Sequence, residues 1–444
     1  MRLAAEWTLL PGEGLQREVA VDIEGGEIRA VDRTAEGAVR LAGRVLLPGL
    51  VNAHSHAFQR ALRGRTQTPD GAPGTFWGWR EKMYALAGAL GPDEVYEVSR
   101  FAFVEMLLAG TTSVGEFFYL VNDPAGRPYE DRTELARQVV RAAADAGIRL
   151  KLLLVAYARG GKDTPARGAQ LRYVDPDLDA YFDRFEALAR IADAGLAPHS
   201  VRALPLEWLR GIALRAGDRV VHAHVAEQRA EVDACLVEHR RRPLALLHDA
   251  GLVTSRFTAV HATHLEADEA RTLGAADATA CLCPTTERDL GDGLADVHAL
   301  EHGGAHIALG TDGQTSASIL EEARGVEMNE RVRLERRNVL GSGDVAHAAI
   351  EWATREGARS LGLHVGALAP GRPADLVALD LEDPSLAGCA DDPKALLASI
   401  AFSSDTRAVR DVWALGVRIV EDGRHISYEA ARAGFEAAMK KIWR

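Results

Sequence analysis

The chain has 444 residues, of which 47% are hydrophobic and 26% are charged, which is usual for a globular protein with a large buried core. Its formal net charge of −12 argues against a nucleic-acid partner, because phosphate binding needs a basic surface. The sequence contains no run of about eighteen uninterrupted apolar residues, so we expect no membrane span.

The first 47 residues alternate short strand-like runs with turns. In "REVAVDIEGGEIRAV", the pair Gly25-Gly26 between two alternating apolar runs predicts a hairpin turn. The same pattern returns at residues 371–383 and 409–424, and "SYEAARAGFEAAMKKIWR" predicts a closing amphipathic helix. We therefore expect a small β-sandwich domain made from both termini, residues 1–47 and 366–444.

Residues 48–365 alternate β-rich runs with helical stretches. The candidate strands are 45–52, 111–117, 150–157, 196–200, 219–227, 257–264, 279–285 and 306–312. Eight strands separated by helices predict an α/β fold, a (β/α)8 barrel of the TIM type. A doubly wound open sheet is the alternative, but no glycine-rich phosphate-binding sequence follows the first strand.

Two histidines, His54 and His56, stand one residue apart where the first strand ends. Residues i and i+2 of a strand point to the same face, so both imidazoles can bind one metal ion. Other candidate strands also end in a histidine or an aspartate, namely His199, His224, His261 and Asp312. All strand ends of this kind open on one face of a barrel, where active sites are built. The pattern predicts a metal site rather than scattered structural histidines.

The predicted metal ligands are His54, His56, His224 and Asp312. Neutral imidazoles with one carboxylate suit zinc or a similar divalent ion, which activates water. His222 shares a strand face with His224, but we prefer His224 because Glu227 follows it by three residues and can transfer a proton to a leaving group. His222 is then expected in the barrel interior.

His261 closes the sixth strand, and we assign it to the activated water as base or electrostatic partner. Together with Asp312 it would handle the proton taken from the water. Glu227, His261 and Asp312 are therefore the predicted catalytic residues.

These positions resemble the amidohydrolase superfamily, as do "LLPGLVNAHSH" and "GALAPGRPADLVALD". The resemblance implies the barrel and the small domain from both termini. Binuclear members usually carry a bridging lysine or glutamate at the end of strand three or four. Here "LLLVAY" and "LAPHSVRA" contain none, and Lys151 lies at the other end of its strand. The resemblance thus implies one divalent metal per chain, with zinc expected.

Further segments resemble one branch of that superfamily, the formimidoylglutamate deiminases of histidine degradation. They are "NAHSHAFQRALRG", "TFWGWREKMYAL", "GEFFYL", "PHSVRAL", "HAHVAEQRAEVDAC", "RRPLALL" and "VHATHL". The resemblance implies hydrolysis of N-formimidoyl-L-glutamate to N-formyl-L-glutamate and ammonia, by a homodimer. One departure stands at Gln314: "TDGQTS" has no histidine where that branch tends to place one after the strand-eight aspartate.

A small dianionic substrate derived from an amino acid needs fixed donors, and the planar guanidinium of arginine suits a carboxylate. Arg202, three residues after His199, and Arg80, in "FWGWRE", are the candidates. The full substrate-binding set that we expect is Gln59, Arg80, Tyr119, His199 and Arg202. The alternatives are that both arginines are solvated surface charges, and that "FWGWRE" is a packed lid helix with Trp77 and Trp79 as core anchors.

Two other functions remain open. A deaminase of the same fold could act on a heterocyclic amine of the guanine or thioadenosine type, and some members of the superfamily are metal-free scaffolds. The scaffold alternative predicts lost ligands, whereas all the expected ones are present. Four scattered cysteines and an N-terminus without a secretory pattern lead us to expect a cytoplasmic protein.

Overall fold

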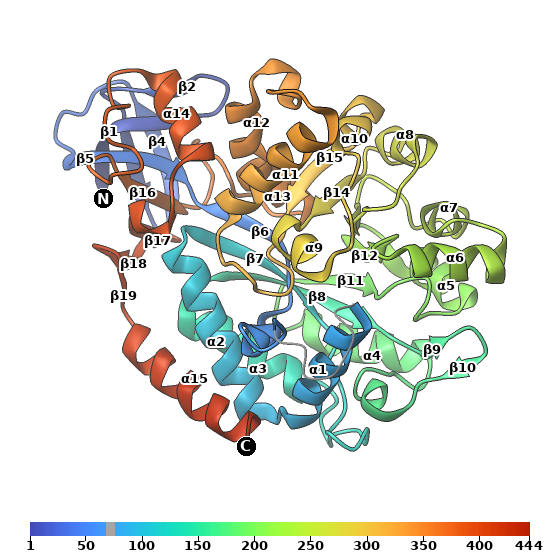
Figure 1. Cartoon of the computed structure of the whole chain (residues 1–444). Helices are drawn as coiled ribbons and strands as arrows, with labels where there is room; N and C mark the ends of the chain where they lie inside the picture. The colour runs from blue at the N-terminus through green and yellow to red at the C-terminus, as the bar shows by residue number, and fades with distance from the viewer. Residues whose placement is uncertain (68–75) are drawn as a thin grey trace.

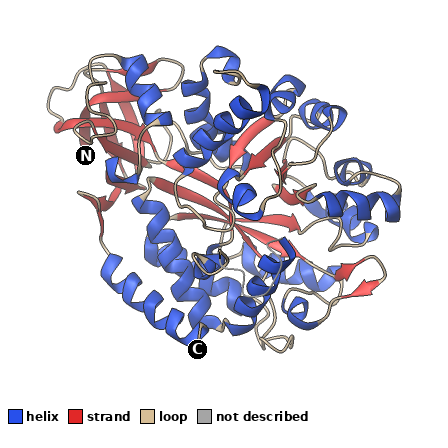
Figure 2. Cartoon of the chain, in the orientation of Figure 1, coloured by secondary structure: helices blue, strands red, loops and turns tan. Residues whose placement is uncertain are grey.

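The computed structural model describes residues 1–67 and 76–444, and these fold into a barrel with a smaller β domain beside it (Figure 1). Figure 2 shows strands at the centre of the barrel and helices around them. Within the described residues the barrel sheet is parallel, and its eight strands lie in chain order. They are β6 (Leu50–Ser55), β7 (Thr111–Phe118), β8 (Arg149–Ala156), β11 (Ala194–Pro198), β12 (Val221–Val225), β13 (Phe257–His261), β14 (Thr279–Leu282) and β15 (His306–Leu309). The predicted α/β barrel is confirmed.

The barrel closes between its first and last strands at their carboxyl ends. Ser55 and Asp312 form a parallel β-bridge. The amide of His56 donates to the carbonyl of Asp312, and the amide of Asp312 donates to the carbonyl of His54, both at 3.0 Å. The backbone that closes the barrel therefore carries three of the four predicted metal ligands.

Helices cover the outside of the barrel between successive strands, as β-α-β connections require. They are α2 (Pro92–Leu108), α3 (Glu134–Ala146), α4 (Leu178–Ala189), α5 (Leu206–Ala216), α6 (Arg229–His239), α7 (Pro243–Asp249), α8 (Ala267–Ala275), α9 (Pro284–Leu290), α10 (Val297–Gly303), α11 (Ile319–Leu334), α12 (Val345–Glu351) and α13 (Gly357–Ser360). Helix α1 (Phe76–Ala89) and the 3-10 helix η1 (Ala57–Leu62) precede α2, and a short hairpin of β9 (Arg159–Gly161) and β10 (Thr164–Pro165) follows β8.

The second sheet takes strands from both ends of the chain. Its N-terminal strands are β1 (Arg2–Leu10), β2 (Gly14–Gln16), β3 (Ala20–Glu24), β4 (Glu27–Asp32) and β5 (Val39–Pro48), and its C-terminal strands are β16 (Leu376–Asp380), β17 (Val409–Ala414), β18 (Val417–Glu421) and β19 (Arg424–His425). The two sets meet where β5 pairs with β16, and Leu3, Val21, Leu46 and Trp413 share a core there. This is the small domain predicted from both termini.

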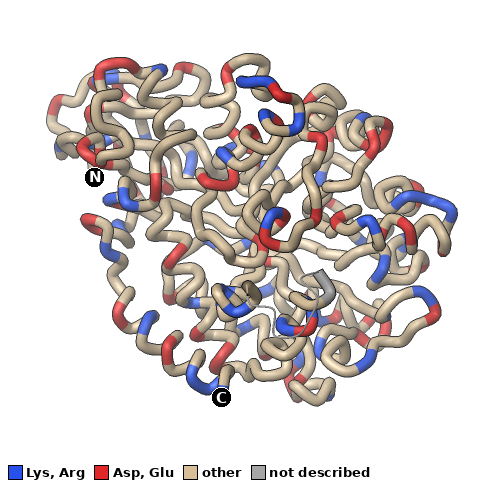
Figure 3. Tube along the Cα trace, viewed as in Figure 1, with Lys and Arg blue, Asp and Glu red and all other residues tan. Residues whose placement is uncertain are grey.

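Two helices follow in this part of the chain, α14 (Pro393–Phe402) and α15 (Tyr428–Ile442). Figure 1 shows α15 beside α2 of the barrel. The rings of Phe435 and Phe101 stack there at a centroid distance of 4.5 Å, so the predicted C-terminal helix packs on the barrel. No helix of the described chain is long and apolar enough to cross a membrane. In the view of Figure 3, acidic and basic residues are interspersed along the trace of both domains.

Candidate active site

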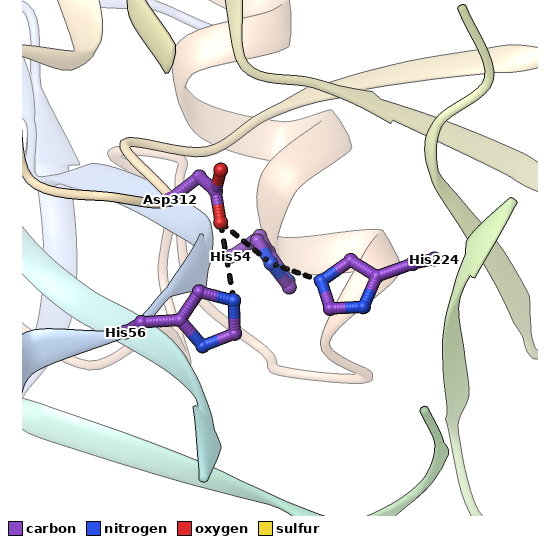
Figure 4. Close-up of side chains that lie close together, drawn as sticks. All are labelled: His54, His56, His224 and Asp312. Carbon is purple, nitrogen blue, oxygen red and sulfur yellow. Dashed lines mark hydrogen bonds and ion pairs between the residues drawn. The ribbon is translucent and has the colours of Figure 1, made fainter. Parts of the chain in front are cut away.

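Four side chains from three strand ends meet at the carboxyl end of the barrel (Figure 4). The ligand atoms of His54, His56, His224 and Asp312 all lie within 4.8 Å of one another, and all four residues are buried. Nε2 of His54 and Nε2 of His56 lie 3.2 and 3.1 Å from Oδ1 of Asp312. Nε2 of His224 lies 3.2 Å from Nε2 of His54. The structure therefore brings the four predicted metal ligands together.

The hydrogen bonds around these imidazoles leave lone pairs facing one another. Nδ1 of His56 lies 2.8 Å from the carbonyl oxygen of Phe117, and Nδ1 of His224 lies 3.1 Å from that of His199. A carbonyl oxygen only accepts, so each Nδ1 carries a proton and each Nε2 of the neutral rings has a free lone pair. The lone pair of His56 then faces a carboxylate oxygen of Asp312, and a cation would relieve that contact. The residues therefore fit a divalent metal.

The protonation states also suit a metal. Burial lowers the pKa of His54 to about 3 and the pKa of His224 well below its ordinary value. Burial opposes ionisation of Asp312 too, but the neighbouring imidazoles of His54 and His56 hold the pKa of this carboxyl well below its usual range. His54 and His224 are thus neutral and Asp312 is ionised at neutral pH, as metal ligation requires.

Glu227 and His261 lie beside the four ligands. Nε2 of His261 is 4.0 Å from Oε1 of Glu227, and its ring stacks on His224 with centroids 5.4 Å apart. Burial raises the pKa of Glu227. Burial alone would lower the pKa of His261, but Glu227, Glu287 and Asp312 outweigh it and raise that pKa well above its ordinary value. A carboxyl and an imidazole that compete for a proton are suited to general acid–base chemistry.

A cavity opens on this end of the barrel. The predicted residues on its wall are His56, Gln59, Arg80, Tyr119, His199, Arg202, His224, Glu227, His261 and Asp312. His54 completes the set as a fully buried side chain. The predicted ligand, proton-transfer and substrate-binding residues therefore lie together, while the role of each residue stays a prediction.

The two predicted arginines reach the cavity from different elements. Arg202 follows β11, and its guanidinium makes no hydrogen bond or ion pair within the part of the chain that the structure describes. Arg80 comes from α1, with its guanidinium carbon 5.4 Å from the ring centroid of Tyr84. Trp79 also lines the cavity, so α1 forms part of its wall. The side chain of Trp77, a predicted core anchor, lies outside the described residues.

The polar residues near the ligands form two small hydrogen-bonded groups. Nε2 of Gln59 donates to the hydroxyl of Tyr119 at 2.8 Å, on the cavity wall. Gln314 is buried, and its Nε2 donates to Oγ of Ser55 and Oγ1 of Thr311, both at 3.0 Å. Gln314 thus holds the loop after β15 against β6, a task that needs no imidazole.

Two residues that the sequence analysis set aside lie elsewhere. Nε2 of His222 lies 2.9 Å from the carbonyl oxygen of Ser360, and His222 is buried outside the group of four ligands. Lys151 forms an ion pair with Asp193, which immediately precedes β11 at its amino end. Lys151 is therefore at the opposite end of the barrel from the ligands.

Sequence reasoning missed several residues around the cavity. Glu116 is fully buried, and its carboxylate accepts from Oγ of Ser55 at 2.6 Å and from the amide of Ala57 at 2.8 Å, on either side of His56. Burial raises the pKa of Glu116 to about 7. Its position inside the apolar strand "TTSVGEFF" was an available signal. Tyr84, Tyr157 and Tyr173 also line the cavity, and of these only Tyr157, at the end of a predicted strand, could have been singled out.

The chain is similar to known proteins over its whole length. It is 39% identical to the formimidoylglutamate deiminase of Pseudomonas aeruginosa, over 99% of this chain and 98% of the relative. It is 30% identical to the 5-methylthioadenosine/S-adenosylhomocysteine deaminase of Halobacterium salinarum, over 95% of this chain and 93% of the relative. Among solved structures, an amidohydrolase from Brucella melitensis has a TM-score of 0.90 and 33% identity, with all of both chains covered.

A solved adenosine deaminase from Xanthomonas campestris with bound zinc has the same fold, with a TM-score of 0.85, 24% identity and coverage of 99% of this chain and 98% of that one. The family model described as "Amidohydrolase family" matches residues 45–419. This range includes the whole barrel and, of the C-terminal strands of the small domain, β16, β17 and part of β18. The chain therefore belongs to the amidohydrolase family.

Proposed function

We propose that this protein hydrolyses N-formimidoyl-L-glutamate to N-formyl-L-glutamate and ammonia, as an enzyme of histidine degradation. Water adds its oxygen to the formimidoyl carbon, the bond from that carbon to the imino nitrogen breaks, and the nitrogen leaves as ammonia. The identity to the Pseudomonas aeruginosa enzyme along nearly the entire chain supports this substrate over those of the more distant deaminases.

The observation that carries the proposal is the guanidinium of Arg202, placed in the cavity without a hydrogen bond or ion pair to the described residues. Arg202 is half-buried, and a cation that is partly removed from water and makes no hydrogen bond is suited to an anionic ligand. The substrate has two carboxylates, and Arg80, on helix α1, lines the same cavity. We infer that the two arginines bind these carboxylates, with Gln59, Tyr119 and His199 as further polar contacts.

The ligands His54, His56, His224 and Asp312 would hold one divalent metal, which we propose is zinc. When bound, such a metal lowers the pKa of water to about 7 and so supplies a nucleophile at neutral pH. His261 and Asp312 would accept the proton that the water loses. Glu227 would hydrogen-bond the imino nitrogen and give it the proton with which ammonia leaves.

A deaminase of heterocyclic amines is the second candidate. Trp79, Tyr84, Tyr157 and Tyr173 line the cavity with aromatic rings, which are surfaces on which a purine can stack. A purine has no carboxylate, however, and would leave Arg202 without a partner.

Release of ammonia from N-formimidoyl-L-glutamate by the purified, metal-loaded protein tests the proposal. Parallel reactions use guanine, 8-oxoguanine, adenosine and 5′-methylthioadenosine. We expect kcat/KM for formimidoylglutamate to exceed that for each purine compound by several orders of magnitude. Faster deamination of any purine compound would replace this proposal with the second candidate.

We also propose, from the resemblance to this branch of the family, that the enzyme is a homodimer and acts in the cytoplasm. Sedimentation equilibrium should give twice the chain mass of 47.8 kDa. A single-chain mass at micromolar concentration would contradict the dimer.

A further inference from the structure

A buried carboxylate, Glu287, lies behind His261 on the side away from Glu227. Oε1 of Glu287 is 3.4 Å from Nδ1 of His261, whereas Nε2 of the same ring is the atom near Glu227. Glu287 is 3% exposed and His261 is 1% exposed, so neither reaches bulk water. The imidazole is thus held between two carboxylates that contact its two different nitrogens.

The orientation of Glu287 is fixed independently of His261. The side chain lies in the first turn of α9, and its Oε1 also accepts the amide hydrogen of Cys283 at 2.8 Å. The same oxygen therefore meets two N–H donors, one from the backbone and one from the imidazole. Because this oxygen only accepts, Nδ1 of His261 must carry a proton, so the ring can lose its other proton only from Nε2, which then directs its lone pair toward the cavity.

The backbone at His261 needs such support. His261 has a φ of 68° and the next residue, Ala262, a φ of 54°, which place two residues other than glycine in the left-handed region. Such conformations cost free energy and persist only where surrounding contacts hold them. The hydrogen bond to Glu287 is a contact that can hold the ring while the backbone leaves β13.

His261, Cys283 and Glu287 also have ligand atoms close enough together to hold a second metal. The hydrogen bonds argue against that use, because Oε1 of Glu287 already accepts from the amide of Cys283 and from His261. Burial also raises the pKa of the Cys283 thiol well above its ordinary value, so the thiolate that a metal needs is disfavoured.

We propose that Glu287 is a positioning residue: it fixes the tautomer and the orientation of His261, so that Nε2 of that imidazole is directed at the reacting water. This inference rests on the proposed function only in taking His261 as the group that accepts the proton from water. It does not depend on which amine or imine is the substrate.

Two substitutions at Glu287 separate geometry from charge. Glu287→Leu removes both hydrogen bonds, and we expect kcat to fall by at least about tenfold with KM within about twofold, because a misdirected base affects the chemical step and not binding. Glu287→Gln keeps an acceptor oxygen for the two N–H groups and loses only the charge. Its kcat should lie between those of the wild type and the leucine variant, about fivefold below the wild type.

Glu322 provides the matched control. It is also a fully buried carboxylate, it also binds the first turn of α9, through the amide of Thr285 at 2.9 Å, and it comes from α11 rather than from a strand of the site. Glu322→Leu should lower the melting temperature at least as much as Glu287→Leu does, with kcat within twofold of the wild type. All variants should retain one metal per chain by elemental analysis.

A crystal structure of Glu287→Leu gives a readout that does not depend on activity: the His261 imidazole should be rotated or disordered in this variant and unchanged in Glu322→Leu. The proposal is overturned if folded, metal-loaded Glu287→Leu keeps kcat within threefold, or if Glu322→Leu loses as much. If Glu287→Leu does not fold, Glu287→Gln decides, and a wild-type kcat there overturns the proposal.

A wild type that releases no ammonia from formimidoylglutamate would instead contradict the proposed function. The same variants would then be compared on whichever purine the wild type deaminates, so the two failures are distinguishable.

Discussion

At the scale of single residues, the cavity contains side chains that we propose bind the substrate and others that we propose transfer protons. Arg202 and Arg80 carry permanent charge and suit carboxylates. We propose that Glu227 and His261 transfer protons, because their environments move the pKa of each away from its ordinary value. Burial raises that of Glu227, and neighbouring carboxylates outweigh burial to raise that of His261. Substitution of Glu227 should therefore lower kcat, whereas substitution of Arg202 should lower kcat/KM.

The Glu227→Gln variant tests proton transfer to the leaving nitrogen. The amide has nearly the same shape but cannot carry a proton, so we expect kcat to fall by about 10²–10⁴-fold with the metal retained. Steady-state ammonia release and elemental analysis measure the two effects. Glu207→Gln, at an exposed position on α5, serves as the control and should behave as wild type. Turnover within threefold of wild type would remove Glu227 from the mechanism.

The Arg202→Met variant tests carboxylate binding. Loss of a charge-assisted hydrogen bond in a desolvated site should lower kcat/KM for formimidoylglutamate by about tenfold or more, with the metal retained. Arg202→Lys should recover only part of this, because lysine keeps the charge and loses the planar pair of donors. The control is Arg215→Met, which removes an exposed arginine paired with Asp179. Normal kinetics for both Arg202→Met and Arg80→Met would exclude the carboxylate contacts.

At the scale of elements, helices between the strands complete the cavity wall and pack behind its residues. Helix α9 carries Glu287 behind His261 and Leu290 on the cavity wall, and α11 holds α9 through Glu322. Helix α1 contributes Trp79 and Arg80 to the cavity wall. Glu287 therefore acts on the cavity through His261, whereas we expect the contact of Glu322 with α9 to contribute to stability.

The contact between α9 and α11 should make stability depend on pH. Burial raises the pKa of Glu322 from its ordinary 4.5 to about 8, so between these two values the folded protein holds a proton that the unfolded chain has lost. The contribution of Glu322 to stability is complete below pH 4.5 and is lost as pH rises to 8, with a slope of at most roughly 1.4 kcal/mol per pH unit.

Glu322→Gln removes this ionisation. The free energy of unfolding of the variant minus that of the wild type should increase from pH 5 to pH 9, because only the wild type loses stability as Glu322 ionises. Urea unfolding of both proteins at several pH values measures the difference. A difference that stays constant across that range would mean that Glu322 does not titrate in it.

At the scale of the whole molecule, three of the proposed metal ligands also join the first and last strands of the barrel. His54, His56 and Asp312 belong to the backbone segments that close β6 onto the loop after β15. A cation bound there would link the first and last strands, and binding to the folded state alone stabilises it by mass action.

Removal of the metal should therefore abolish activity and also lower the melting temperature, and adding zinc should restore both. We expect about one tightly bound divalent metal per chain by elemental analysis. His224→Asn should lose metal and activity together, whereas His222→Gln, at the buried histidine outside the group of ligands, should keep both. Two equivalents of metal, both required for activity, would contradict the proposal of a single metal.

The sequence by itself determined most elements of the barrel and their order, because local periodicity encodes them. The predicted strand 45–52 is an exception, since the structure divides it between β5 of the small domain and β6 of the barrel. The predicted strand 111–117 is β7, Thr111–Phe118, within one residue. The spacing of His54 and His56 placed both on one strand face, and the residues at the strand ends indicated a shared site before any contact was known. The predicted strands 219–227 and 257–264 end earlier, at Val225 and His261, because the backbone turns to positive φ at Ala226 and Ala262, which apolar periodicity does not reveal.

Only the tertiary structure decided which residues distant in sequence meet. The bridge from Ser55 to Asp312, the contact of Glu287 with His261 and the absence of an internal partner for Arg202 within the described residues all depend on how helices and strands pack in three dimensions. Pairs such as these are separated by tens to hundreds of residues, and no local pattern of hydrophobic and polar residues records their distance. The residue types therefore predicted the kind of site, whereas the geometry of that site depends on tertiary packing.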